Sequence, residues 1–206
     1  MCCLDEFFHP WAPHDIIKLR RLSSAVFYAI ESYIAYAWDV ERVIGRWFFD
    51  TRAFRKALDA ANGVISGSEA LSFFSRTEFR GNDLDLYVPL HGLIPLGRYL
   101  DRVGYDYQPS ACMDPCFDTA ALTFAACIAP SHESSTPART LGSSTPGAGT
   151  LESYAFSPFN FVHSTTDWQG QVLSTMRVQL IGVRGDPVEH IINSFHSSMY
   201  HITLPL

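Results

Sequence analysis

The 206-residue sequence has no run of apolar residues long enough for a membrane helix, which needs roughly 18 consecutive apolar residues. Its opening segment, MCCLDEFFHPWAPHD, also lacks the basic region and the uninterrupted apolar run of a secretory signal peptide. Cysteine is scarce, and the five cysteines do not form the dense, regular framework of a small secreted domain. We therefore expect a protein of the cytoplasm or the nucleus, with no membrane association.

Basic residues are also few, because 15 Lys and Arg stand against 21 Asp and Glu, which gives a formal net charge of −6. They are spread along the chain apart from short pairs such as Arg20–Arg21. Such a surface has no stripe of positive charge that would follow a phosphate backbone. The pattern argues against avid nucleic-acid binding but leaves room for contact with a single nucleotide.

Apolar residues, in contrast, are plentiful. Hydrophobic residues make up 47% of the chain and charged residues only 17%, a composition typical of a chain that folds. The length suits one good-sized domain, or a compact domain with an extension. We predict a helical extension over residues 1–50 and an α/β domain over residues 51–206, and we find no internal repeat.

The first third of the chain has helical periodicity. Apolar residues recur at spacings of mostly three and four across residues 13–50, with a break near Ser23–Ser24. Asp15, after Pro13, is expected to cap the first helix. Residues 52–62 predict a further short helix, and Asn62–Gly63 are expected to reverse the chain at its end.

Strands and helices then alternate, which favours an α/β sheet with helices on its faces. The first predicted elements are a strand opening at Gly63–Val64–Ile65, a helix over 69–76, a strand over 83–89 ended by Pro89, and a helix over 93–103. Towards the end of the chain we predict a strand over 174–183, a helix over 186–195 and a strand over 197–206. Asp186 is the expected N-cap of the helix over 186–195, and Pro187 is expected at its first position.

Residues 105–167 show a weaker pattern. The segment DTAALTFAACIA, residues 118–129, fits either a strand or a buried helix, and periodicity does not decide between them. Residues 130–150 are rich in Ser, Thr, Pro and Gly and have few apolar residues. We predict that they form a flexible surface insertion.

A pair of carboxylates and a serine-glycine-serine turn form the most informative pattern. Side chains alternate along a strand, so Asp83, Asp85 and Tyr87 share one face of the segment DLDLYV. Two neighbouring carboxylates repel each other, and Mg²⁺ or Mn²⁺, which prefers oxygen ligands, relieves that repulsion. Upstream, the turn Ser66–Gly67–Ser68 opens a helix whose free N–H groups suit a phosphate. Together these segments predict a site for a metal–triphosphate.

This pattern resembles the core of the nucleotidyltransferase superfamily, which includes poly(A) polymerases and antitoxin-type minimal enzymes. The resemblance covers residues 52–104 and, less specifically, 175–195. The segments ISGSEALSFF, DLDLYVP, VQLIGV and INSFHSS are also similar to a group of uncharacterised fungal proteins that often carry an F-box-like N-terminus.

The resemblance implies an α/β (α+β) fold, with a nucleotidyltransferase-like mixed sheet flanked by helices. By position, Ser66, Gly67 and Ser68 would contact the phosphates of a nucleotide. Asp83 and Asp85 would hold Mg²⁺ or Mn²⁺ and would be the catalytic pair.

One departure from the family concerns a third carboxylate, which active members usually carry on the next core strand. Here that strand is expected at residues 177–183, which contain no acid, and Gln179 stands where the acid is expected. An amide is a neutral ligand and cannot act as a base, so we expect a degenerate or weakly active binder of a nucleotide and a divalent metal. Strand 177–183 should pair beside residues 83–88 and bring Gln179 next to both aspartates. Asp167 or Asp186 is a possible substitute from a loop.

The same residues also fit simpler structural roles. Ser66-x-x-Glu69 is a capping box as well, which needs no ligand. Asp83 follows Gly-Asn and would then cap a turn, while Asp85 would face solvent on an edge strand.

Other candidate sites receive little support. Cys112 and Cys116, with His132 nearby, lack a second close pair of zinc ligands, so we expect free thiols that are partly buried. A serine-hydrolase interpretation lacks the Gly-x-Ser-x-Gly motif.

The segment PHDIIKLRRLSSAVFYAIESY resembles the second half of an F-box, but the leading Leu-Pro segment of that motif is not present. The resemblance implies a ubiquitin-ligase linker protein as a partner, and an adaptor or interaction scaffold without catalysis. The simpler alternative is a pack of helices that covers one face of the sheet.

Overall fold

The structure, a computed structural model, describes residues 3–77, 79, 81, 83–128 and 158–194. Five strands form one sheet in the order β1-β2-β5-β4-β3, in which β2 and β5 are parallel and the other neighbours are antiparallel. The strands are β1 (Val64–Ser66), β2 (Leu84–Pro89), β3 (Asp106–Gln108), β4 (Phe159–Thr166) and β5 (Val172–Val183). The predicted α/β class is confirmed, as a mixed sheet with helices and an N-terminal helical region.

Helices precede the sheet and connect its strands. They are α1 (Cys3–Phe8), α2 (Pro13–Leu19), α3 (Ser24–Ala37), α4 (Val40–Ile44), α5 (Thr51–Ala60), α6 (Gly67–Ser75), α7 (Leu90–Arg102), α8 (Phe117–Ile128) and α10 (Pro187–Ser194). Within the described part of the chain, none of them is both long enough and apolar enough to cross a membrane.

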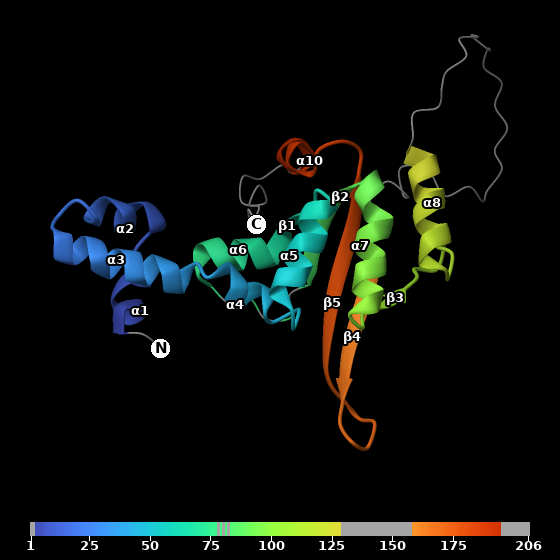
Figure 1. The fold of residues 1–206 in the computed structure, drawn as a ribbon, viewed down its shortest axis with the longest axis horizontal. Coiled ribbons are helices and arrows are strands. Elements are labelled where there is room, and N and C mark those ends of the chain that lie inside the picture. Colours follow the sequence, from blue (N-terminus) through green and yellow to red (C-terminus); the bar gives the residue numbers. More distant parts are fainter. Residues whose placement is uncertain (1–2, 78, 80, 82, 129–157, 195–206) are drawn as a thin grey trace, which may run out of the picture.

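The main hydrophobic core lies between one face of the sheet and the helices α5, α7 and α8 (Figure 1). Alternation along the strands turns Leu84, Leu86 and Val88 of β2 into this core, together with Val178 and Leu180 of β5. The helices supply apolar side chains at helical spacing, such as Phe54, Leu58, Leu93, Leu96, Leu100 and Phe124. The opposite face of the sheet carries the polar residues Asp85 and Gln179 as well as apolar residues such as Ile181.

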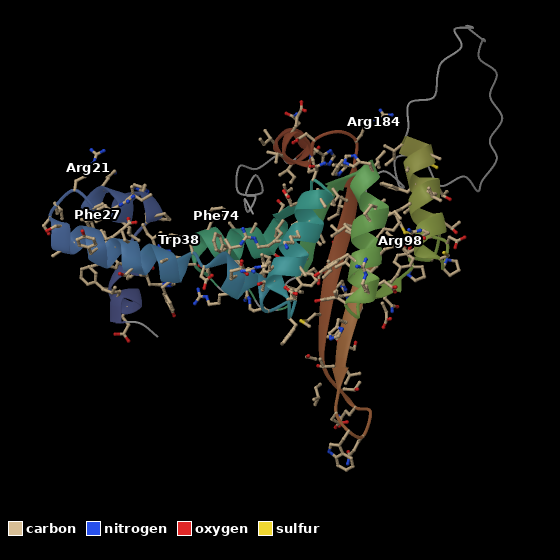
Figure 2. All side chains as sticks on the ribbon, viewed as in Figure 1. Arg21, Phe27, Trp38, Phe74, Arg98 and Arg184 are labelled. Atoms are coloured by element: carbon tan, nitrogen blue, oxygen red, sulfur yellow. The ribbon has the colours of Figure 1, made fainter. Side chains whose placement is uncertain are left out.

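A second hydrophobic cluster joins α1, α2 and α3, and it contains Phe8, Ile16, Ile30, Tyr33 and Ala37. Figure 1 shows these three helices beside the sheet, beyond the far end of α6. The expectation that they cover one face of the sheet is wrong, because their apolar side chains pack on one another instead. Trp38, labelled in Figure 2, packs against both clusters and lies where they meet.

Arg76 ties the N-terminal helices to the end of α6. It adopts a left-handed conformation (φ 57°), which ends the helix. Its Nη1 donates to the carbonyl of Phe8 at 3.0 Å and to the hydroxyl of Tyr33 at 2.6 Å, and its Nη2 donates to the carbonyl of Trp11. The guanidinium also lies 5.2 Å from the ring of Trp38. One side chain thus contacts several separate parts of the N-terminal region.

The predicted helix starts are partly right. The break near Ser23–Ser24 is confirmed, because Ser23 caps α3 by accepting a hydrogen bond from the amide of Val26 at 3.2 Å. The prediction that Asp15 caps the first helix is wrong, because α2 already begins at Pro13 and Asp15 lies inside its first turn. There its Oδ1 accepts a hydrogen bond from Nζ of Lys18 at 3.4 Å. The chain reversal after α5 is confirmed, with Asn62 at φ 50°.

The elements of the second half follow the predictions where the local pattern was clear. Asp186 caps α10 by accepting from the amides of Val188 at 2.8 Å and Glu189 at 3.0 Å, as expected. The ambiguous segment 118–129 is largely helical, within α8. The predicted insertion 130–150 and the predicted strand 197–206 lie outside the described residues.

Candidate functional site

A row of polar residues crosses the sheet on the face opposite the main core. Ser66 of β1 is in register with Asp85 of β2, Asp85 with Gln179 of β5, and Gln179 with Asn160 of β4. Residues directly opposite each other in neighbouring strands project from the same face. The row therefore brings four polar side chains together from four strands.

The predicted pairing of the third strand is confirmed. β5 pairs in parallel with β2 from Leu84 opposite Val178 onward, which places Gln179 opposite Asp85. The Nε2 of Gln179 donates to Oδ2 of Asp83 at 2.8 Å. Gln179 thus lies next to both aspartates, as the sequence predicted.

Asp83 also has a basic neighbour on β5. The Nη1 of Arg177 lies 3.5 Å from Oδ2 of Asp83, the oxygen that also accepts from Gln179. One carboxylate oxygen of Asp83 therefore faces two hydrogen-bond donors from the same strand.

Gly67 brings the start of α6 against the carboxylate of Asp85. It has φ 72°, a conformation that glycine adopts without strain, and a Cβ added there would collide with Oδ2 of Asp85. Ser66, just before it, is fully buried. The first N–H groups of α6 and the carboxylate of Asp85 therefore lie at the same place on the sheet.

The capping-box alternative does not describe this turn. The Ser66 side chain forms no capping hydrogen bond with α6. Glu69, only 2% exposed, forms an ion pair with Arg46, which follows α4. The alternative placement of Asp85 on an edge strand is also wrong, because β2 lies between β1 and β5.

Burial makes Asp85 the unusual acid of this face. Loss of solvent, together with the charge of Asp83, raises the pKa of Asp85 to about 7 from an ordinary value of 3.8. Tyr87, two residues on and on the same face, has its pKa raised to about 12 by burial and by the charge of Asp85. Its ring centroid lies 6.3 Å from that of His190 on α10. A cation placed beside Asp85 would replace the proton that this environment favours.

Neither loop acid joins the pair. Asp167 accepts hydrogen bonds from the amides of Gln169 and Gln171, both at 2.8 Å, and so holds the β4–β5 turn. Asp186 caps α10. Among the described residues no group of three or more His, Cys, Asp and Glu side chains could hold a metal ion. Within that part of the chain, the aspartates thus have an amide and a guanidinium beside them and no third carboxylate.

The prediction for the cysteines is partly right. Cys112 and Cys116, as well as Cys127, are free as expected, but they are exposed and not partly buried. His132 lies outside the described residues.

Sequence reasoning missed two residues of this face, Arg177 beside Asp83 and Asn160 opposite Gln179. Arg177 precedes Gln179 by two residues, so strand alternation alone would have placed it on the same face. Asn160 lies in a segment without clear periodicity, and its place depends on the pairing of β4 with β5. No local signal could have found it.

Comparison with known proteins adds no evidence on the fold or on the site. The chain matches no protein-family model, no curated protein and no solved structure. What is established is therefore a mixed α/β protein with a row of polar residues on the face of its sheet opposite the main core.

Proposed function

We propose that this protein has a nucleotidyltransferase-like fold and binds a nucleotide together with a divalent cation, with weak or no transferase activity. The observation that carries the proposal is the contact between Gly67 and Asp85. It joins the N-terminus of a helix, where anions bind, to a buried carboxylate, where cations bind.

The residues present fit one hard cation. Asp83 and Asp85 would hold Mg²⁺ or Mn²⁺, because both carboxylates lie at the same end of β2, and the cation would have to displace the proton that burial favours on Asp85. Such a cation, when bound, would neutralise the charge of the phosphates and orient them. The backbone N–H groups at Gly67 and Ser68, at the start of α6, would bind the phosphates, and the buried Ser66 directly precedes them.

The same residues argue against efficient transfer. A second cation would need a further carboxylate, and Gln179 supplies an amide whose Nε2 donates to Asp83. An amide cannot take a proton from an attacking hydroxyl. We therefore expect binding without efficient catalysis.

Calorimetry with Mg²⁺ and each nucleoside triphosphate tests the proposal. The wild type should bind at least one triphosphate in the presence of Mg²⁺, and Asp83→Ala/Asp85→Ala should lose that binding. Asp101→Ala/Asp106→Ala, which removes two exposed acids elsewhere on the surface, is the matched control and should keep it. Equal binding by the wild type and the site variant, or none by either, would refute the proposal.

A second candidate is an adaptor whose N-terminal helices dock a ubiquitin-ligase linker protein. It is favoured by the position of these helices beside the sheet and by their exposed apolar side chains, among them Leu22 and Tyr28, each 69% exposed. Pull-down of the linker protein by the full chain tests it, with Leu22→Glu/Tyr28→Glu as the variant. The adaptor hypothesis is rejected if the wild type and the variant capture the linker protein equally, or if neither captures it.

A further inference from the structure

A cavity of about 600 Å³ lies where the N-terminal helices meet the α/β core. Figure 1 shows α3, α4 and α6 converging in this region. Its walls come from these three helices and from the residues that follow α1, α4 and α6. The cavity therefore exists only when the two hydrophobic clusters are joined.

Positive charge dominates the wall of this cavity. Arg42, Arg46 and Arg76 all line it, together with His9, and no acidic residue is among the described lining residues. This is unusual in a chain with a net charge of −6. The cavity thus concentrates three guanidinium groups at one place.

Two of the three arginines form no ion pair with any described carboxylate. These are Arg42 and Arg76, and Arg76 is held instead by two carbonyls and the Tyr33 hydroxyl. Arg46 is paired with Glu69, but its side chain remains 49% exposed. A guanidinium carries five donors, so Arg46 has donors left after this pairing. The local charge is therefore only partly compensated.

Aromatic side chains give the cavity an apolar wall as well. The ring of Tyr36 lies under the guanidinium of Arg42, with 4.8 Å between the guanidinium carbon and the ring centroid, and Phe73 contributes from α6. The volume of this cavity is in the range of small-molecule sites, about 300–1,000 Å³, and is larger than an inorganic ion would fill. Its chemistry suits an anionic head and an apolar body.

We propose that this cavity is a binding site for a small organic phosphate, with Arg42 and Arg46 binding the phosphate group and Tyr36 and Phe73 contacting the organic part. Guanidinium groups match phosphate oxygens in geometry, and two such groups favour a doubly charged anion. Arg76 stays fixed by its own hydrogen bonds and contributes positive charge.

This site is separate from the one at the aspartates. The cavity meets α6 at Ser72 and Phe73 and at Arg76 just beyond it, whereas Gly67 and Asp85 meet at the first residue of that helix. Ser72 is five residues from Gly67, which is roughly 7.5 Å along the helix at 1.5 Å per residue. The two sites can therefore be removed independently.

The test uses the full chain and three probes: phenyl phosphate, inorganic phosphate and phenol. Binding is followed by calorimetry and by amide chemical shifts. Phenyl phosphate should bind the wild type more tightly than either other probe, with shifts concentrated at Ser72, Phe73 and Thr77. Arg42→Gln should weaken that binding by about tenfold or more, as expected when a charge-assisted hydrogen bond is lost.

Three further variants show whether phenyl phosphate binds in this cavity. Arg102→Gln removes an equal charge from the exposed end of α7 and should bind as the wild type does. Thr77 lines the cavity and is exposed, so Thr77→Glu should also weaken phenyl phosphate binding by adding negative charge. This variant replaces Arg42→Gln in the test if Arg42→Gln does not fold. Asp83→Ala/Asp85→Ala should leave phenyl phosphate binding intact. The proposal would be overturned if phenyl phosphate does not bind the wild type, or if Arg102→Gln weakens its binding as much as Arg42→Gln does. It would also be overturned if inorganic phosphate or phenol binds as tightly as phenyl phosphate.

Discussion

Gly67 lies against the carboxylate of Asp85 so closely that no side chain fits between them. The contact joins β2 to the first residue of α6, two elements separated in the sequence by the turn before Asp83. The absence of a side chain at position 67 is therefore a requirement of the site as well as of the backbone.

Gly67→Ala should destabilise the protein more than the same change at a glycine of similar backbone conformation. Positive φ alone costs about 1–2 kcal/mol for alanine, and overpacking adds about 1–3 kcal/mol. Gly170, with φ 80° and nothing within 4 Å, is the control and should show only the backbone cost. Urea denaturation measures both. Combining Gly67→Ala with Asp85→Ala should recover part of the loss; equal losses for the two glycines would contradict the contact.

The stability of the protein should depend on pH through Asp85. Its folded pKa of about 7 lies above the ordinary value of 3.8, so between these values the folded state binds a proton that the unfolded chain has released. The free energy of unfolding should therefore fall as pH rises from about 4 to about 7, by about 2–4 kcal/mol.

Asp85→Asn should flatten this dependence, because asparagine does not titrate. Denaturation at several pH values between about 4 and about 8 measures the slope. Asp106→Asn, an exposed acid on β3, is the control and should keep the wild-type slope. A slope that is the same in wild type and Asp85→Asn would show that Asp85 is not the group responsible.

Gln179→Glu should add a third carboxylate beside Asp83 and Asp85. The added charge replaces a hydrogen bond of 2.8 Å with repulsion, so the metal-free variant should be less stable by about 1–3 kcal/mol. Mn²⁺ should then raise its melting temperature more than that of the wild type.

Gln108→Glu is the matched control for this change, since Gln108 is exposed on the edge strand β3. It should alter neither the metal-free stability nor the response to Mn²⁺. Thermal unfolding with and without the ion measures both. If Gln179→Glu behaves like this control, residue 179 does not belong to a cation site.

Arg76→Ala should loosen the N-terminal helices from the α/β core. It removes the hydrogen bonds to Phe8, Trp11 and Tyr33, with an expected loss of about 2–4 kcal/mol. Hydrogen exchange should rise in α1–α3 before it rises in the sheet. Arg20→Ala, which breaks an exposed ion pair with Glu31, should cost about 0–1 kcal/mol and leave exchange unchanged.

The sequence is sufficient for the elements with strong local signals. Alternation in DLDLYV places Asp85 on the face opposite Leu84 and Leu86, and the pairing of β5 with β2 is expected from the family resemblance alone. Other features depend on tertiary contacts. Arg76 ends a helix where no glycine marks the end, because its side chain finds partners in a region far back in the sequence. The prediction for Asp15 fails because a proline at the first helical position already sets the start of α2.

The parallel pairing of β2 with β5 also bears on how the chain folds. Asp83 and Gln179 are 96 residues apart, and β5 enters the middle of the sheet after the four other strands have been made. Until it arrives, β2 has an open edge beside the β1 pairing, and β4 lacks its longest partner. Such edges invite pairing with other chains, and long-range closure is slow. We therefore expect the unfinished chain to be prone to pairing with other chains until β5 takes its place between β2 and β4.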